Sequence, residues 1–364
     1  MTLSDAADRI AARLCRDAIW SHGRCTWLSE RIAGDNRLST APVGPDFYHG
    51  TAGIALFLLS MAQATGDSIF RETAEGALAH ALDQAERIDR DRRPGFYCGW
   101  GGIVWVLSCF ERGEEAVQWA GGLHPTAELD LLIGSGGAIP ALLRVGLADL
   151  AAEHGDHLIA NRIQGAWPTP RNPNRRCLTG FAHGAAGIAW SLTELYGATG
   201  EARFRDTARE GFHYESSCYN QERRNWPDYR NDPPGYMTAW CHGATGIGLA
   251  RERAAEILSD EGYRAEAEIA RETSKSSLEN IGAGNFSLCH GHAGNAEFCH
   301  SKETMEAGIA EFEEKRMPWP CGTKGAGEIP GLMLGIAGIG HTCLRLTDPD
   351  RYPSVLVPSI ATIR

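Results

Sequence analysis

Long hydrophobic runs are missing from this sequence. No stretch approaches the roughly 18 consecutive apolar residues that a membrane-spanning helix needs. The N-terminal segment MTLSDAADRIAARLCRDAIW has neither the basic start nor the apolar core of a signal peptide. Its apolar residues instead predict one face of an amphipathic helix, made of Leu3, Ala6, Ile10, Leu14 and Ala18. We therefore expect a cytoplasmic protein with no membrane span.

Positive charge is also in short supply. The 364 residues include 35 Lys and Arg against 46 Asp and Glu, which gives a formal net charge of −11. A nucleic-acid surface needs a basic face, so this balance argues against a nucleic-acid partner, although it permits a cationic peptide. With 43% hydrophobic residues a chain of this length can bury a sizeable core. We expect a single domain over residues 1–364.

A disulfide framework is the third absence. The eleven cysteines are odd in number and widely spread, and a chain of this size does not need cross-links. Most of them, such as Cys109 and Cys343, lie in apolar helical context and are expected to be small core residues. Cys241 and Cys289 differ, because each is followed directly by a histidine and then a glycine.

Glycine, by contrast, is abundant and repeated. A G-x-x-G pair followed by an apolar run occurs seven times, as in FAHGAAGIAWSL and WCHGATGIGLA, with an average spacing of about 48 residues. That spacing is typical of a unit of two helices and two connections. The first glycines of the seven motifs are Gly50, Gly99, Gly134, Gly184, Gly243, Gly291 and Gly335.

A second similarity supports the repeat. ATGDSIFRETA (64–74) and ATGEARFRDTA (198–208) begin at the same distance after their motifs, and each predicts a loop, a helix cap and an amphipathic second helix. Glycines three apart let another backbone approach closely, which fits an inner ring of crowded helix starts inside an outer layer of helices. The last motif is as apolar as the others and lacks the polar capping repeat of an open array, which favours a closed ring.

Two polar insertions interrupt the repeats, Ile163 to Cys177 and Tyr219 to Tyr236. Both are rich in proline, asparagine and arginine, which predicts loops. Each precedes a motif that has a histidine before its glycine, so the loops either line a binding mouth or are simply solvated.

The two Cys-His pairs are a candidate zinc site, because zinc favours thiolate and imidazole ligands. The candidate ligands are Cys241, Cys289 and one or both of His242 and His290. Four ligands would make a closed structural site, whereas three would leave a position for water or a substrate. The alternative is two buried cysteines that only pack at crowded helix starts. An open site with two thiolates suits the delivery of a thiolate nucleophile better than hydrolysis.

A thiolate that adds to an electrophilic alkene produces an enolate, which must be protonated by a general acid. Histidine has a suitable pKa for this role. His183 and His49 hold equivalent positions before their motif glycines, and Asp130 lies four residues before Gly134, where it could orient or assist the acid. A single histidine in a helical repeat is more often structural, but its recurrence at this position favours a role for His183 and His49.

These motifs together resemble the lanthionine synthetase C-like cyclases, most closely the C-terminal cyclase domain of class II lanthipeptide synthetases. The resemblance covers nearly the whole chain and includes LTGFAHGAAGIAWSL, NWPDYR, GYMTAWCHGATGIGLAR, SLCHGHAGN and CGT. It implies an all-α fold, an α/α toroid of seven inner and seven outer helices. It also implies one Zn²⁺ held by Cys241, Cys289 and His290, with His183 as the acid/base residue. Asp130 matches an aspartate of the family.

The implied reaction is intramolecular Michael addition of a peptide cysteine thiolate to dehydroalanine or dehydrobutyrine, which forms lanthionine or methyllanthionine. The partner would be a dehydrated precursor peptide. Class II synthetases carry an N-terminal dehydratase domain that this sequence lacks, so we expect a separate dehydratase or an excised piece. In the family pattern His242 is not a ligand, and many relatives have an acidic residue in place of His49. The segments after Cys109 and Cys299 look short for full outer helices.

Two other functions compete with this one. A non-catalytic scaffold could bind a peptide or a partner enzyme and hold a structural zinc, although a scaffold needs no acid. A small thiol such as glutathione could instead add to a dehydrated peptide at the same site.

Overall fold

The computed structural model describes residues 1–32, 34, 37–169, 176–279, 284–358 and 360. The chain forms two compact units. The first comprises Met1–Ile88 and Leu278–Ser354, and the second comprises Asp89–Ser277 and Val355–Arg364. Within the described residues no helix is long and apolar enough to cross a membrane. Part of the first predicted insertion, residues 170–175, lies outside the description.

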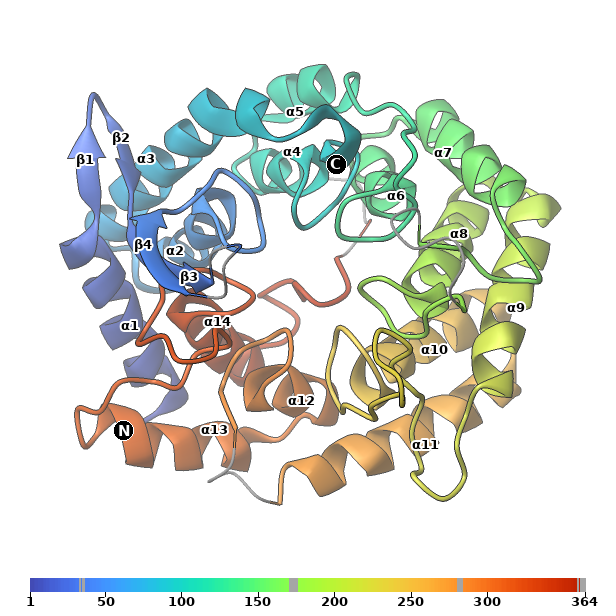
Figure 1. Cartoon of the computed structure of the whole chain (residues 1–364). Helices are drawn as coiled ribbons and strands as arrows, with labels where there is room; N and C mark the ends of the chain where they lie inside the picture. The colour runs from blue at the N-terminus through green and yellow to red at the C-terminus, as the bar shows by residue number, and fades with distance from the viewer. Residues whose placement is uncertain (33, 35–36, 170–175, 280–283, 359, 361–364) are drawn as a thin grey trace. The chain divides into compact units, whose positions relative to one another are not determined.

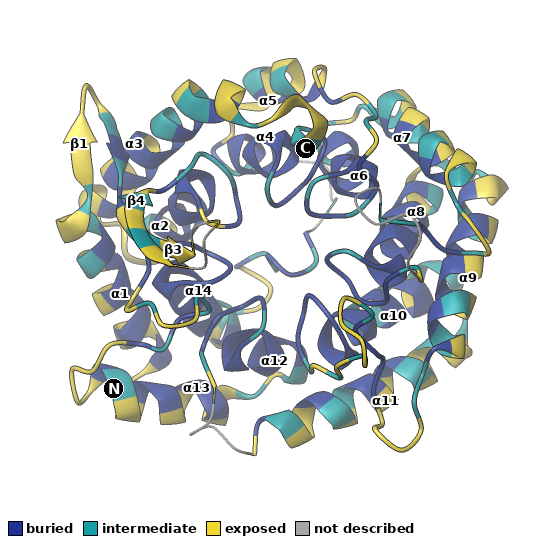
Figure 2. Cartoon of the chain, viewed as in Figure 1, coloured by how far each residue is buried: buried dark blue, intermediate teal, exposed yellow. Residues whose placement is uncertain are grey.

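Every one of the seven glycine motifs begins a helix, as predicted, and these motif helices are buried almost throughout (Figures 1 and 2). Several of them, such as α2 and α4, are apolar on all sides, which is typical of a helix with little solvent-exposed face. The motif helices are α2 (Thr51–Thr65), α4 (Trp100–Cys109), α6 (Ser135–Arg144), α8 (Ala185–Thr199), α10 (Ala244–Leu258), α12 (His292–Cys299) and α14 (Ile336–Thr347).

Each motif helix packs against a more polar partner helix, whose outer face is exposed in Figure 2. Six partners follow their motif helices in sequence: α3 (Ser68–Gln84), α5 (Gly113–Ala120), α7 (Ala148–Ala160), α9 (Ala202–Ser217), α11 (Glu261–Ser277) and α13 (Lys302–Gly308). As predicted, α5 and α13 are short; the π-helix η3 (Ile309–Glu313) extends α13. Short 3₁₀ turns lie at η1 (Ala85–Arg87) and η2 (Arg90–Arg92).

The partner of the last motif helix comes from the other end of the chain. Helix α1 (Leu3–Asp17) packs on α14 within the first unit. Its predicted apolar face is buried from Leu3 to Leu14, whereas Ala18 lies just beyond the helix end. A capping box at its start joins the side chain and backbone of Thr2 to those of Asp5. The chain therefore needs no polar capping repeat, because α1 covers the face that α14 would otherwise expose.

The glycines of the motifs are required by close backbone approach. A Cβ atom at Gly246 would lie 1.9 Å from the carbonyl oxygen of Trp240 and 2.6 Å from Cβ of Phe181. The approaching backbone is thus the chain's own segment before the motif, together with the neighbouring repeat. Gly243 has a further requirement, since its φ of +87° lies in a region that L residues rarely adopt.

The segments before neighbouring motifs are joined by backbone hydrogen bonds. In the second unit these are Cys98 N–H to Leu132 O (2.9 Å), Leu131 N–H to Ala182 O (3.3 Å) and Ala182 N–H to Cys241 O (3.2 Å). In the first unit Cys289 N–H donates to Met333 O and Met333 N–H to Tyr48 O, both at 2.9 Å. These bonds pair backbone groups in the segments before the motifs, and they fix the residues that precede each motif glycine.

Two small antiparallel sheets were not anticipated from the sequence. Strands β1 (Ile19–Ser21) and β2 (Arg24–Thr26) form one pair, and β3 (Leu28–Ile32) and β4 (Leu38–Pro42) form the other. Trp20 lies opposite Cys25, and Glu30 lies opposite Thr40. The described parts of the two polar insertions are irregular, with isolated bridges such as Asp228 to Gly235, so the predicted loops are confirmed there.

Candidate functional site

His183 and Asp130 form a direct pair in the second unit. Both lie in the segments before motif helices, His183 ahead of α8 and Asp130 ahead of α6. The Nδ1–H of His183 donates to Asp130 Oδ2 at 2.7 Å, and Asp130 Oδ1 accepts the backbone N–H of Ile133 at 2.9 Å. The backbone N–H of Ile133 therefore holds the Asp130 carboxylate in place, and the carboxylate orients the His183 imidazole. The sequence named both residues but could not show that they touch.

This pairing sets the charge state of the histidine. Burial lowers the pKa of His183, but the negative charge of Asp130 and its hydrogen bond raise it more, so the pKa lies above the ordinary value. Nδ1 is committed to Asp130, which leaves Nε2 as the nitrogen that can give or take a proton. With 31% of its side chain exposed, His183 can reach a reactant.

Cys241 is held at the start of α10 by its neighbours in sequence. Its carbonyl accepts the N–H of Ala182, and the indole N–H of Trp240 donates to Leu356 O at 2.9 Å. The cysteine is 8% exposed. The unusual backbone of Gly243 follows directly, so the chain turns sharply into the helix just after the Cys-His pair.

The side chain of His242, the next residue, is bound to the loop before α8. It is 1% exposed, and its Nδ1–H donates to Thr179 O at 3.2 Å. Among the described residues its Nε2 has no hydrogen-bond partner. Its ring stacks on that of His183 with the centroids 6.0 Å apart. Burial lowers the pKa of His242, only partly offset by Cys241 and Asp228, so the ring is neutral at pH 7.

Asp228 and Arg230 were missed as site residues, although both lie in the NWPDYR motif that marks the resemblance. The Arg230 guanidinium binds both carboxylate oxygens of Asp228, with Nε at 2.9 and 3.0 Å. Burial alone would raise the pKa of Asp228, but this hydrogen bonding and nearby positive charge hold it below its usual range. Arg230 also acts electrostatically on His183 and His242 and lowers the pKa of each. The second insertion therefore places charge at the site.

Cys289 and His290 belong to the first unit, at the start of α12. Cys289 is 3% exposed, and its sulfur accepts a hydrogen bond from the Tyr48 hydroxyl at 2.8 Å. His290 Nε2–H donates to Gly322 O at 3.0 Å, which places the imidazole lone pair on Nδ1. A carbonyl that binds the far nitrogen is the usual way to orient a metal-binding histidine. The CGT motif supplies that carbonyl, and the FYHG motif supplies Tyr48.

The chemistry of this donor set fits a metal ion. Cys241, Cys289 and His290 are a group that could hold one. Two thiols with one imidazole of defined tautomer match the preference of zinc, and three protein ligands leave a fourth position open. The other repeat-position histidine, His49, is exposed, and its backbone N–H donates to Asp46 Oδ1 at 2.8 Å.

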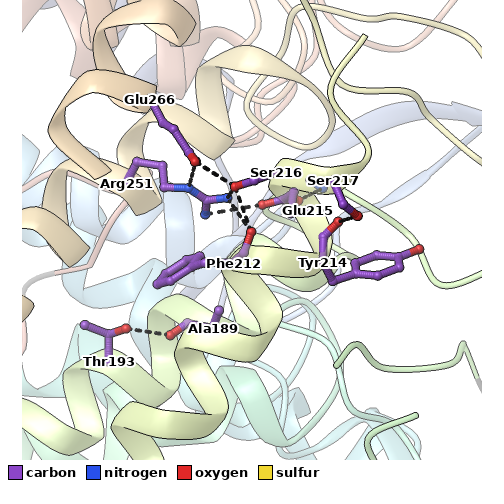
Figure 3. A network of polar contacts seen from close by, with 10 residues as sticks. Ala189, Thr193, Phe212, Tyr214, Glu215, Ser216, Ser217, Arg251 and Glu266 are labelled. Atoms are coloured by element: carbon purple, nitrogen blue, oxygen red, sulfur yellow. Dashed lines mark hydrogen bonds and ion pairs between the residues drawn. The ribbon is translucent and has the colours of Figure 1, made fainter. Parts of the chain in front are cut away.

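A buried ionic network supports the second unit's part of the site (Figure 3). Arg251 of α10 is fully buried and lies 2.6 Å from Glu266 of α11 and 3.5 Å from Glu215 of α9. Glu215 in turn accepts the N–H of Gly180 at 2.7 Å. A Cβ at Gly180 would lie 2.7 Å from Cys241 O, so the network holds the loop that packs against the Cys-His pair.

Comparison with known proteins identifies the family. The lanthionine synthetase C-like protein family matches residues 41–357. This chain belongs to that family. It is 22% identical over 377 residues to the lacticin 481/lactococcin biosynthesis protein LcnDR2 of Lactococcus lactis subsp. lactis, which covers 92% of this chain and 39% of that protein. The chain thus spans well under half the length of this curated relative.

Solved structures agree on the fold. Nisin cyclase superposes with a TM-score of 0.68 at 14% sequence identity, covering 96% of this chain and 95% of the other. An unsaturated glucuronyl hydrolase from Bacillus sp. GL1 superposes with a TM-score of 0.50 at 16% identity, covering 96% and 97%. The predicted all-α fold, an α/α toroid, is confirmed.

Proposed function

We propose that the protein is a zinc-dependent lanthionine-forming cyclase that acts on a dehydrated peptide in the cytoplasm. The observation that carries the proposal is a Cys₂His donor set in a chain that also holds a His–Asp pair at 2.7 Å. A metal scaffold would need the first but has no use for the second. Membership of the lanthionine synthetase C-like family supports the same reaction.

Cys241, Cys289 and His290 would hold the zinc ion. When bound, zinc supplies Lewis acidity that lowers the pKa of a substrate thiol at the open position, while the two cysteine ligands keep that sulfur electron-rich. Tyr48 and Gly322 O orient the ligands from the first unit.

His183 acts after the peptide thiolate has added to the β-carbon of dehydroalanine or dehydrobutyrine. The addition moves the alkene's electron pair into an enolate, and Nε2 of protonated His183 gives its proton to the α-carbon. Asp130 keeps the imidazole in one orientation and favours its protonated form. The thiol S–H bond and the alkene π bond break, while one S–C bond and one C–H bond form. The proton that the thiol loses balances the one that His183 gives, and no group leaves, so the mass of the peptide is unchanged.

The substrate must already be dehydrated, and we propose that a dehydratase supplies it, either as a separate protein or as another part of a longer chain.

The test uses purified protein and candidate dehydrated peptides. Metal analysis should find about one zinc per chain, the occupancy that one Cys₂His site predicts. Incubation followed by thiol alkylation and mass spectrometry should show alkylation lost while the peptide mass stays constant. His183→Ala should keep zinc and lose about 10²–10⁴-fold in rate, the usual contribution of a general acid. Full activity in that variant would remove His183 from the mechanism.

The same assay separates the two competing functions. Binding of the peptide with no loss of free thiol would indicate a scaffold. A mass gain of one glutathione, seen only when glutathione is added, would indicate addition of an external thiol.

A further inference from the structure

A groove lies on the first unit, between α1 and the segment that follows α13. Its volume is about 570 Å³, within the range of pockets that bind small groups or a few side chains. Arginines and apolar residues line most of it, together with two glutamates. The arginines are Arg9, Arg13, Arg16 and Arg316, and the glutamates are Glu313 and Glu328.

One wall is a basic stripe on α1. Arg9, Arg13 and Arg16 are spaced by four and three residues, so they share one face of the helix. This stripe borders the buried apolar face that packs on α14. The stripe can be read from the sequence RIAARLCR. The residues across the groove determine which of its charges are already paired.

The floor of the groove is electrically balanced. Arg13 donates to both oxygens of Glu313, at 2.9 and 2.5 Å, and the indole N–H of Trp319 donates to Glu313 Oε1 at 2.7 Å. Glu328 lies 3.6 Å from Arg13 and accepts the backbone N–H of Trp319. Both glutamates are therefore satisfied by Arg13 and Trp319.

The rim carries two further arginines. Arg9 and Arg316 are exposed, and neither side chain makes a hydrogen bond or an ion pair within the part of the chain that the structure describes. Arg9 does act electrostatically on Asp5, Glu313 and Glu314 and lowers the pKa of each. They approach the groove from its two walls, Arg9 from α1 and Arg316 from the turn after η3. Arg16 is paired with Asp17 at 2.7 Å and contributes less.

Apolar surface lies between these two arginines. Met317 is 55% exposed, and Pro318 beside it is exposed too. The turn that presents them is fixed, because Met317 N–H donates to Phe312 O at 2.8 Å and Arg316 N–H to Glu313 O at 3.3 Å. A flexible, polarizable methionine suits contact with varied apolar side chains.

We propose that this groove docks an acidic peptide segment, whose carboxylates pair with Arg9 and Arg316 and whose apolar side chain packs on Met317. Charge complementarity selects the occupant, since four arginines and only two glutamates line this groove on a chain of net charge −11. The apolar surface at Met317 and Pro318 favours a peptide over a nucleic acid, which has no apolar side chain to place there. If the protein is the proposed cyclase, a substrate docked here would also be concentrated at the catalytic site, a consequence that rests on that function.

Docking can be measured without turnover. The probe is a short fluorescein-labelled peptide of alternating Glu and Leu, titrated with the full chain and followed by fluorescence anisotropy. Binding should weaken as salt is raised, and the same peptide with Gln in place of Glu should bind at least ~10-fold more weakly, as expected for lost charge-assisted contacts.

Variants then place the site. Arg9→Gln combined with Arg316→Gln should lower the affinity about tenfold, while Arg264→Gln, at an exposed arginine of α11, should leave it unchanged. Met317→Ser should lower the affinity with the salt dependence intact. Circular dichroism and thermal unfolding check that each variant is folded. Equal binding by the double variant overturns the proposal, as does tighter binding to single-stranded DNA or to phosphatidylserine vesicles than to the Glu peptide.

Discussion

The two Cys-His-Gly motifs have the same three letters and different structures. In the motif of α10 the histidine, His242, is 1% exposed and its Nδ1–H is bound to Thr179 O. In the motif of α12 the histidine, His290, is partly exposed and its Nε2–H is bound to Gly322 O. The lone pair is therefore on Nε2 in one ring and on Nδ1 in the other.

The carbonyls that set these tautomers lie outside the motifs, 63 and 32 residues away in sequence. The backbone differs as well, since the motif glycine has a φ of +87° at Gly243 and −122° at Gly291. Identical short motifs thus do not make identical ligands. Which histidine can bind a metal is decided by distant residues of the fold.

The largest test of this difference replaces one histidine at a time. His290→Ala and Cys289→Ala should lose zinc, from about one ion per chain to almost none, because each removes a third of the proposed ligand set. His242→Ala should keep the zinc. Metal analysis of the purified variants, by inductively coupled plasma mass spectrometry, checks this.

Loss of zinc from His242→Ala together with its retention in His290→Ala would reverse the assignment. Loss from both would indicate a closed four-ligand site, which could not take a substrate thiol. Thermal unfolding shows whether a variant that lacks zinc is still folded.

The backbone difference predicts that alanine destabilises the two motifs to different extents. Gly243→Ala would place a Cβ 1.8 Å from Met237 O at a φ of +87°, whereas Gly291→Ala would place one 2.4 Å from Asn285 O at an ordinary φ. Both should destabilise the protein, and Gly243→Ala by about 1–3 kcal/mol more, the cost of this backbone region for an L residue. Urea unfolding measures the difference.

Gly113→Ala is the matched control, because nothing lies within 4 Å of a Cβ there and its φ is ordinary. Its free energy of unfolding should stay within about 1 kcal/mol of the parent protein. Equal stability of the Gly243 and Gly291 variants would mean that clash, and not conformation, dominates at both positions.

Local sequence was enough to predict the helices that bear the site. The seven G-x-x-G motifs each begin a helix. Every copy keeps the glycines because backbone atoms approach them too closely for a side chain. The sequence also suggested closure, but not that α1 would cover α14, since that contact joins the two ends of the chain. The short strands β1 to β4 escaped prediction because their exposed residues, such as Trp20 and Leu28, show no clean alternation.

The sequence named candidate site residues but did not predict the contacts between them. Spacing within motifs named His183 and Asp130, but their 2.7 Å hydrogen bond joins residues 53 apart. Tyr48 donates to Cys289, and Gly322 O accepts from His290. Neither residue is of a type that marks it as part of a metal site in the sequence. Such partners are fixed only when the fold brings separate repeats together.

A smaller effect is expected from Asp130→Asn. This substitution removes the carboxylate that pairs with His183, the proposed general acid, whose ring stacks on His242 of the α10 motif. The charge of Asp130 raises the pKa of His183, so its removal should lower that pKa. A general acid works in its protonated form, and the rate falls as pH rises through its pKa. The alkaline limb of the pH–rate profile should therefore move to lower pH, with zinc content unchanged.

His242 offers the control for that shift, although its ring stacks on His183. His242→Gln should leave the alkaline limb close to that of the parent protein. If the alkaline limb moved with His242→Gln and not with Asp130→Asn, the titrating acid would be His242, and the assignment to His183 would be wrong.

The smallest effect concerns the hydroxyl that supports the α12 motif. Tyr48 donates to Cys289 sulfur at 2.8 Å, and a donor to a thiolate stabilises the charged form that binds metal. Tyr48→Phe should keep the fold and the zinc but weaken zinc affinity about tenfold, as for other groups that support a metal ligand. Competition with a chromophoric chelator measures it. Tyr97→Phe also removes a buried hydroxyl, one bound to Val355 O at 2.8 Å, and should leave zinc affinity unchanged. If both variants lost zinc affinity equally, the effect of Tyr48→Phe would come from the loss of a buried hydroxyl in general. The hydrogen bond to the Cys289 sulfur would then make no specific contribution to zinc binding.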